Sequence, residues 1–128
     1  MRHAYQLASR YGPTPAAVVD IILAWNGRQR TVPALVDTGA SGTVIRLEDY
    51  TSLRLLKIGD EEEIGGVGDA RGVPTVVDLT FEGLDLPSFP VLAMTDPNFQ
   101  VILIGRDVLN RILLECNGPQ LEFEATQP

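Results

Sequence analysis

The sequence predicts an all-β fold, either a barrel or a sandwich, with one short helix. Short runs of β-branched and large apolar residues recur along the 128-residue chain. Turn-forming pairs such as Asn26-Gly27 and Asn117-Gly118 separate several of these runs. The best helix candidate, residues 106–111, is short. Closely spaced strands with frequent turns are typical of closed or packed antiparallel sheets.

The chain divides into an N-terminal arm and one domain. Residues 1–17 are mixed in character and end in Gly12-Pro13-Thr14-Pro15, so we expect an arm there and a single domain over residues 18–128. Apolar runs of strand type then alternate with turns, and residues 47–53 favour a short helical turn. The predicted strands are residues 18–25, 30–36, 43–45, 75–81, 89–94, 100–104, 112–116 and 121–124. Further turns are expected at Glu82-Gly83 and Leu86-Pro87.

Composition excludes several classes of partner. The chain carries a net charge of −7, which argues against nucleic acid or an anionic membrane surface, because both require a basic patch. Its single cysteine, Cys116, cannot form an internal disulfide and is typical of a reducing compartment. No apolar run is long enough to span a membrane, and no signal-peptide core follows Met1. We expect a cytoplasmic protein.

Most catalytic chemistries lack their residues in this chain. The one histidine, His3, lies in the predicted arm, where it is a poor base for a serine or cysteine nucleophile. Zinc sites built from Cys and His lack ligands. The four acids of residues 60–63 alternate between the faces of a strand, which favours a solvated surface over a cation site. We therefore expect no metal and no cofactor, and carboxylate chemistry remains.

One acidic turn stands between two apolar runs. Asp37-Thr38-Gly39 follows residues 34–36 and precedes residues 43–45, both of strand type. A carboxylate so close to apolar strands is costly unless it is hydrogen-bonded or paired. By itself the trio is a weak signal, because Asp, Thr and Gly all favour ordinary turns.

Three segments together resemble the retropepsin-like aspartic proteases, the retroviral proteases and their cellular and bacterial relatives. Leu35–Ser41 is similar to the catalytic loop of that family. Ile64–Gly68 is similar to the tip of the flap that closes over substrate. Ile102–Leu109 is similar to the strand, glycine and helix that support the loop. The resemblance implies an acid-protease barrel with a flap hairpin, working as a homodimer.

The resemblance also implies roles for the loop residues. Two carboxylates held close together share a proton, so that one activates water as a general base and the other polarises or protonates the scissile amide. The chain has one such motif, so the second acid is expected to be Asp37 of a second copy. Thr38 is expected to bond across the two-fold axis, and Gly39 to present its carbonyl to the substrate.

The remaining site residues fall into two groups. Substrate-binding residues are expected in the loop, the flap and the apolar strands: Leu35, Ser41, Val44, Ile64, Gly65, Gly66, Val67, Val101 and Leu103. Several of them could equally be core residues. Structural support is expected from Gly105, Arg106 and Asp107. In many viral relatives the arginine pairs with an acid where this chain has Ser41, so that ion pair is absent or moved.

The sequence thus predicts an aspartic endopeptidase that cleaves extended, mainly apolar peptide segments. The alternative is a catalytically silent peptide-binding or dimerisation module on the same fold, which the intact Asp37-Thr38-Gly39 disfavours. A structural all-β protein with an accidental turn explains neither the glycine-rich segment nor Ile104-Gly105-Arg106. The C-terminal hairpin, residues 112–124, is expected to contribute strands to the dimer interface.

Overall fold

The computed structural model describes residues 1–64 and 70–128. Within them the strands are β1 (Arg2–Ala4), β2 (Val18–Trp25), β3 (Arg28–Val36), β4 (Val44–Ile45), β5 (Glu62–Glu63), β6 (Arg71–Phe81), β7 (Leu84–Met94), β8 (Ile102–Ile104), β9 (Leu113–Asn117) and β10 (Glu122–Thr126). The helical segments are the 3₁₀ turn η1 (Ser9–Tyr11), α1 (Leu47–Ser52) and α2 (Arg106–Leu109). The prediction of an all-β fold is confirmed.

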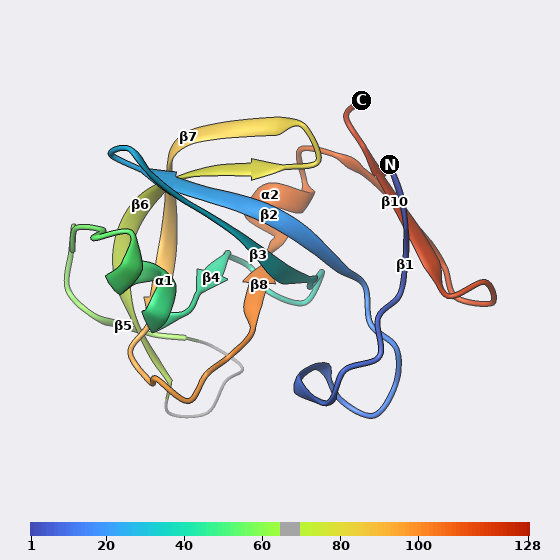
Figure 1. Cartoon of the computed structure of the whole chain (residues 1–128), viewed down its shortest axis with the longest axis horizontal. Helices are drawn as coiled ribbons and strands as arrows, with labels where there is room; N and C mark the ends of the chain where they lie inside the picture. The colour runs from blue at the N-terminus through green and yellow to red at the C-terminus, as the bar shows by residue number, and fades with distance from the viewer. Residues whose placement is uncertain (65–69) are drawn as a thin grey trace.

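Six of these strands close into a barrel (Figure 1). The sheet order is β2-β3-β8-β4-β7-β6, and a further antiparallel pairing of β2 with β6 completes the circle. Strand β5 adds to the outer edge of β6. The pairs β3–β8 and β4–β7 are parallel, so segments far apart in the sequence lie side by side at the centre of the sheet.

The hairpin of β6 and β7 is longer than predicted. Each strand has 11 residues, and they meet at a tight turn in which Glu82 and Gly83 both have positive φ. The predicted turn at Leu86-Pro87 is wrong, because both residues lie inside β7. The pairing of β6 with β7 shifts register between Val77 and Leu79, opposite Pro87 and Ser88. At this shift the Asp78 carboxylate accepts a hydrogen bond from the Ser88 N–H at 2.8 Å.

The short helical turn predicted over residues 47–53 is present as α1, so the described residues contain two α-helices where the fold class named one. Asp49 is fully buried, and its carboxylate accepts hydrogen bonds from the Arg46 N–H at 3.0 Å and from the Arg46 guanidinium at 2.9 Å. The hydrogen bond to Asp49 is the main cause that raises the pKa of Arg46 above its usual value. The paired charges fix the start of the helix.

Alternation along the strands builds the core inside the barrel. On β2, Ile21 and Leu23 are buried while Asp20 between the apolar positions is exposed. On β6, Val77 and Phe81 point to the same interior. Successive side chains of a strand point to opposite faces, so this pattern places one face of each strand inside the barrel. The buried face gives the strands around Asp37 a rigid support.

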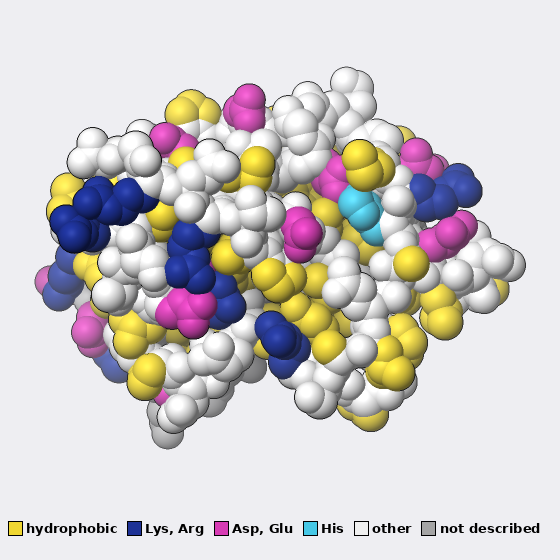
Figure 2. Space-filling model, viewed as in Figure 1, with side chains coloured by type: hydrophobic (Ala, Val, Ile, Leu, Met, Phe, Trp, Pro, Cys, Tyr) yellow, Lys and Arg dark blue, Asp and Glu magenta, His cyan; other side chains and the backbone are white. Residues whose placement is uncertain are grey.

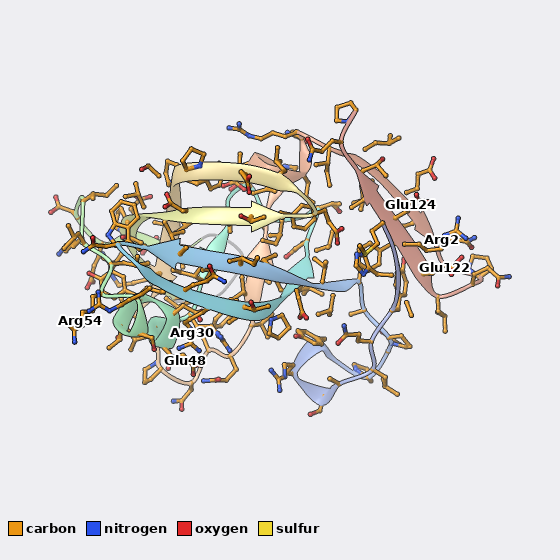
Figure 3. The ribbon with its side chains drawn as sticks, turned by 45° about the horizontal axis from the view of Figure 1, so that its top comes forward. Arg2, Arg30, Glu48, Arg54, Glu122 and Glu124 are labelled. Carbon is orange, nitrogen blue, oxygen red and sulfur yellow. The ribbon has the colours of Figure 1, made fainter. Side chains whose placement is uncertain are left out.

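The two ends of the chain form a separate three-stranded sheet, ordered β1-β10-β9 (Figure 1). We call it the terminal sheet. Arg2 lies between Glu122 and Glu124, with nitrogen–oxygen distances of 3.7 and 3.6 Å (Figure 3). His3 is hydrogen-bonded to Glu82 in the β6–β7 turn, which ties the terminal sheet to the barrel. The predicted arm thus contains a strand paired with the C-terminal hairpin.

Charge is unevenly spread over the face seen in Figure 2. Lys and Arg side chains gather mostly at the left, over α1 and the turn of the β2–β3 hairpin, and hydrophobic side chains gather in the middle. Near α1, Arg30 donates a hydrogen bond to Glu48 at 2.8 Å (Figure 3). Among the described residues, no helix is long and apolar enough to cross a membrane.

Candidate active site

Asp37 stands where β3 leaves the sheet. Val36 pairs with Ile104 of the parallel strand β8, and the Asp37 N–H continues this ladder with a hydrogen bond to the Ile104 carbonyl at 3.0 Å. The Asp37 side chain is half-buried. The position of the Asp37 backbone is therefore set by the pairing of β3 with β8 in the barrel.

The loop after Asp37 folds back on the carboxylate. The Gly39 N–H donates to Asp37 Oδ1 at 2.9 Å, and the Ala40 N–H donates to the Asp37 carbonyl at 3.2 Å. An aspartate side chain that accepts a bond from the backbone two residues on is a standard way to build a tight turn. Thr38, between them, is exposed. The loop therefore presents Asp37 from one side and leaves Thr38 free of this chain's core.

Arg106 braces the loop through backbone atoms. Its guanidinium Nη1 donates to the Thr38 carbonyl at 3.0 Å, and its backbone N–H donates to the Ala40 carbonyl at 2.9 Å. Ser41 supplies no carboxylate, and the arginine binds the loop backbone instead. In place of the ion pair discussed for the family resemblance, Arg106 makes hydrogen bonds to carbonyl groups of the loop.

A second brace joins Thr43 to α2. Asp107 accepts from the Thr43 N–H at 3.1 Å and from the Thr43 hydroxyl at 2.8 Å, while that hydroxyl accepts from the Gly105 N–H at 3.1 Å. Thr43 is 2% exposed. Buried polar groups are stable only when hydrogen-bonded, and here each one is. The exit of the Asp37 loop is thus locked to the start of α2.

Gly105 lies directly under the loop. A Cβ at this position would lie 2.5 Å from the carbonyl carbon and oxygen of Gly42. Any larger residue would have to push the backbone of the loop away, because a main-chain group cannot rotate aside as a side chain can. The close contact brings the loop and the β8–α2 junction together.

The loop opens into a cavity of about 590 Å³. Its described lining residues are Asp37, Gly39, Ala40, Ser41, Gly42, Val44, Glu62, Glu63, Ile64, Leu92, Leu103 and Arg106. Six of the predicted catalytic and substrate-binding residues meet there: Asp37, Gly39, Ser41, Val44, Ile64 and Leu103. Thr38, Leu35 and Val101 are not among its lining residues. The predicted flap positions Gly65, Gly66 and Val67 lie outside the described residues.

The base of the predicted flap hairpin is present in the described residues. Glu62 and Glu63 of β5 pair with Gly72 and Arg71 of β6, and the Ile64 N–H bonds to the Ala70 carbonyl at 2.9 Å. The side chain of Ile64 is 7% exposed and is buried with Val44 and Met94. One wall of the cavity is therefore an antiparallel hairpin anchored by an apolar side chain.

Sequence reasoning missed Thr43, Gly42, Leu92 and Glu62 as site residues. A hydroxyl residue just before an apolar strand is a signal for Thr43, because a buried hydroxyl needs partners. Leu92 reaches the cavity only because β7 lies parallel to β4, a pairing between distant segments. The sequence of either strand alone carries no such information.

Comparison with known proteins identifies the family. The family model described as aspartyl protease matches residues 19–108, from β2 to α2, and so includes the Asp37 loop and both of its braces. The chain belongs to the aspartyl protease family. A search of the curated proteins found no match.

Solved structures show that this aspartyl protease has the retropepsin-like fold. A retropepsin-like aspartic protease from Rickettsia conorii is 16% identical, with a TM-score of 0.66, and the match covers 98% of this chain and 91% of that one. The retroviral protease-like domain of Ddi1 from Leishmania major is 20% identical, with a TM-score of 0.58 and coverages of 86% and 87%. EIAV protease, solved with the inhibitor HBY-793, is 23% identical, with a TM-score of 0.57 and coverages of 74% and 86%.

Proposed function

We propose that this aspartyl protease is a homodimeric endopeptidase in which Asp37 and its copy in a partner subunit form the catalytic dyad. The observation that carries the proposal is the half-buried Asp37 carboxylate, held at the end of barrel strand β3 and lining a cavity whose walls combine aliphatic and charged side chains. Among the described residues, that carboxylate accepts one hydrogen bond, from the Gly39 N–H. Its other oxygen remains available for water or for a second acid.

Two carboxylates are needed because one alone is a weak base at neutral pH. When two lie close together, they cannot both ionise easily, and the pair holds one proton between them. The ionised member takes a proton from water, which attacks the scissile carbonyl, and the protonated member donates to the peptide group. The exposed Thr38 is suited to bond across the two-fold axis, as the family resemblance implies.

An extended peptide fits the shape of the site. The flap hairpin and the Asp37 loop flank the cavity, and an extended chain can add to their free backbone groups as a strand would. Val44, Ile64, Leu92 and Leu103 line the cavity with aliphatic surface. These residues favour substrates that place apolar side chains beside the scissile bond.

Cleavage of a peptide library tests the proposal. Wild type and Asp37→Asn are compared between pH 4 and 6, with and without a statine-type inhibitor. The expected result is inhibitor-sensitive cleavage by the wild type and a loss of at least about 10³-fold in rate for Asp37→Asn, the scale of loss when an essential catalytic group is removed. Asp20→Asn, which removes the same charge at an exposed position of β2, is expected to cleave as the wild type does.

Equal cleavage by the wild type and Asp37→Asn would overturn the proposed function. Peptide binding without any cleavage would favour the silent binding module instead. Because Asp37→Asn keeps the shape of the side chain, a melting temperature close to that of the wild type separates loss of chemistry from loss of folding.

A further inference from the structure

A second hollow adjoins the proposed catalytic cavity. It has a volume of about 220 Å³ and shares Gly42, Glu62 and Leu92 with the cavity around Asp37. The two spaces therefore meet at the base of the flap hairpin. A peptide long enough to extend past the first cavity has a path into the second.

The outer hollow is mainly aliphatic. Ile58, Pro74 and Pro90 form much of its wall, and Ile58 is 56% exposed. The Ile58 N–H donates to the Pro74 carbonyl at 2.9 Å, which fixes the loop after α1 against β6. The hollow is thus a formed groove that suits the aliphatic part of a side chain.

Glu62 stands at the junction of the two hollows. It lies two residues before Ile64, so both side chains are on the same face of the extended segment, the face on which Ile64 is buried beside the cavity. Its cross-strand neighbour is Gly72, which has no side chain to meet it. In the described part of the chain, no Lys or Arg nitrogen lies within 4.0 Å of its carboxylate.

Two neighbouring charged side chains on this hairpin and on the cavity floor are already engaged, and Glu63 lines the Asp37 cavity but not the outer hollow. Glu61 is paired with Arg71 at 3.4 Å. Arg106, on the cavity floor, donates to the Thr38 carbonyl. Among the described residues, Glu62 is the one carboxylate that lines both hollows, and Asp107 in the outer hollow is already bonded to Thr43.

We infer that Glu62 selects substrates with a Lys or Arg side chain away from the scissile bond, whose stem lies along the outer hollow. Leu92, Pro74 and Pro90 contact the methylene groups of that stem, and its charged end bonds to the Glu62 carboxylate. Long basic side chains bury their stems on apolar surface and leave the charge at a polar edge. The inference rests on the proposed function, because it assumes a peptide in the Asp37 cavity.

Paired statine peptides test this recognition directly. Each pair is identical except for Lys or norleucine at one position, and the position is moved along both sides of the statine. Dissociation constants are measured for the wild type, Glu62→Gln, Glu62→Lys and Asp60→Asn. Asp60 is exposed and lines neither hollow, so Asp60→Asn controls for the loss of one negative charge on the same segment.

At one or more positions, Lys is expected to bind the wild type and Asp60→Asn roughly tenfold more tightly than norleucine, the usual gain from a hydrogen bond to a charged group. Glu62→Gln is expected to lose this preference and to keep its affinity for the norleucine peptides. Glu62→Lys is expected to bind the Lys peptide less tightly than the norleucine peptide. No advantage for Lys at any position, an advantage that survives in Glu62→Gln, or no binding of any statine peptide would overturn the inference.

Cleavage is scored separately, on matched peptides with an ordinary amide bond. Cleavage that depends on Asp37 but is indifferent to Lys supports the proposed function and overturns the role of Glu62. A Lys preference in binding without cleavage supports the role of Glu62 and counts against the catalytic proposal.

Discussion

Gly105 and Gly42 are 63 positions apart in the sequence, yet their backbones lie in contact beneath the Asp37 loop. The glycine after the apolar strand could be singled out from the sequence by its resemblance to the supporting segment of the family. Its contact with Gly42 could not, because Gly42 is an ordinary turn residue until the two segments meet. Thr43 was missed for the same reason, since its partners Gly105 and Asp107 lie on another element.

Gly105→Ala is expected to lower the free energy of unfolding by about 3 kcal/mol, because the new methyl group overlaps the backbone of Gly42 and the loop must shift. Urea denaturation followed by circular dichroism measures the change. Peptidase activity is expected to fall further than stability alone explains, because the shift reaches Asp37.

The matched control for this change is Gly118→Ala. Gly118 lies in the β9–β10 turn, and a Cβ there has nothing within 4 Å. Its substitution is expected to change stability by about 0.5 kcal/mol or less, as for an ordinary surface position. Equal stabilities of the two variants would show that the loop adapts to the added methyl group.

At the scale of elements, the strands with clear alternation or strong turns could be predicted from the sequence. The Asn26-Gly27 hairpin and the final hairpin lie where their turn residues placed them. Leu86-Pro87 misled the prediction, because Pro in the β6–β7 hairpin is accommodated by a register shift that local sequence does not reveal. Helix α1 lies where a short helical turn was predicted, but the Arg46–Asp49 pair at its start was not foreseen, because arginine rarely caps a helix.

The Arg46–Asp49 pair supplies the prediction at this scale. Asp49→Asn is expected to reduce the free energy of unfolding by about 3 kcal/mol, since it leaves the buried Arg46 guanidinium with only the half-exposed Glu48 carboxylate at 3.6 Å. Glu48→Gln, on the exposed side of the same helix, is expected to cost at most about 0.5 kcal/mol. Urea titration of both variants measures the contrast, and a similar cost for each would contradict it.

At the scale of the whole molecule, the barrel and the approach of the Asp37 loop to its supports are properties of one chain. The proposed second aspartate belongs to a partner chain, and a single chain cannot reveal which surfaces meet that partner. The terminal sheet keeps the N-terminal strand paired with β10 in the same chain, and β9 lies at its edge with several exposed side chains. We expect that edge to contribute to the dimer interface.

Charge sets the expected behaviour of such a dimer. Each chain carries −7, so two carry −14 (twice −7), and the repulsion between them weakens as salt screens it. Sedimentation equilibrium is expected to show a dimer dissociation constant that falls as ionic strength rises. Peptidase activity per subunit is expected to fall when the protein is diluted. If the sample is purely monomeric and its peptidase activity is still proportional to protein concentration, the proposal of a dyad shared between two subunits is contradicted.

The hydrogen bond from the Asp37 N–H to the Ile104 carbonyl has a consequence for biosynthesis. A ribosome makes residue 37 long before residue 104, and until then the Asp37 loop lacks its neighbouring strand β8, the brace from Arg106 and the floor at Gly105. The aspartate thus lacks these supports while residues 38–103 are made. The loop can take the conformation described above only after residues 104–106 have followed it, 67 to 69 positions later in the chain.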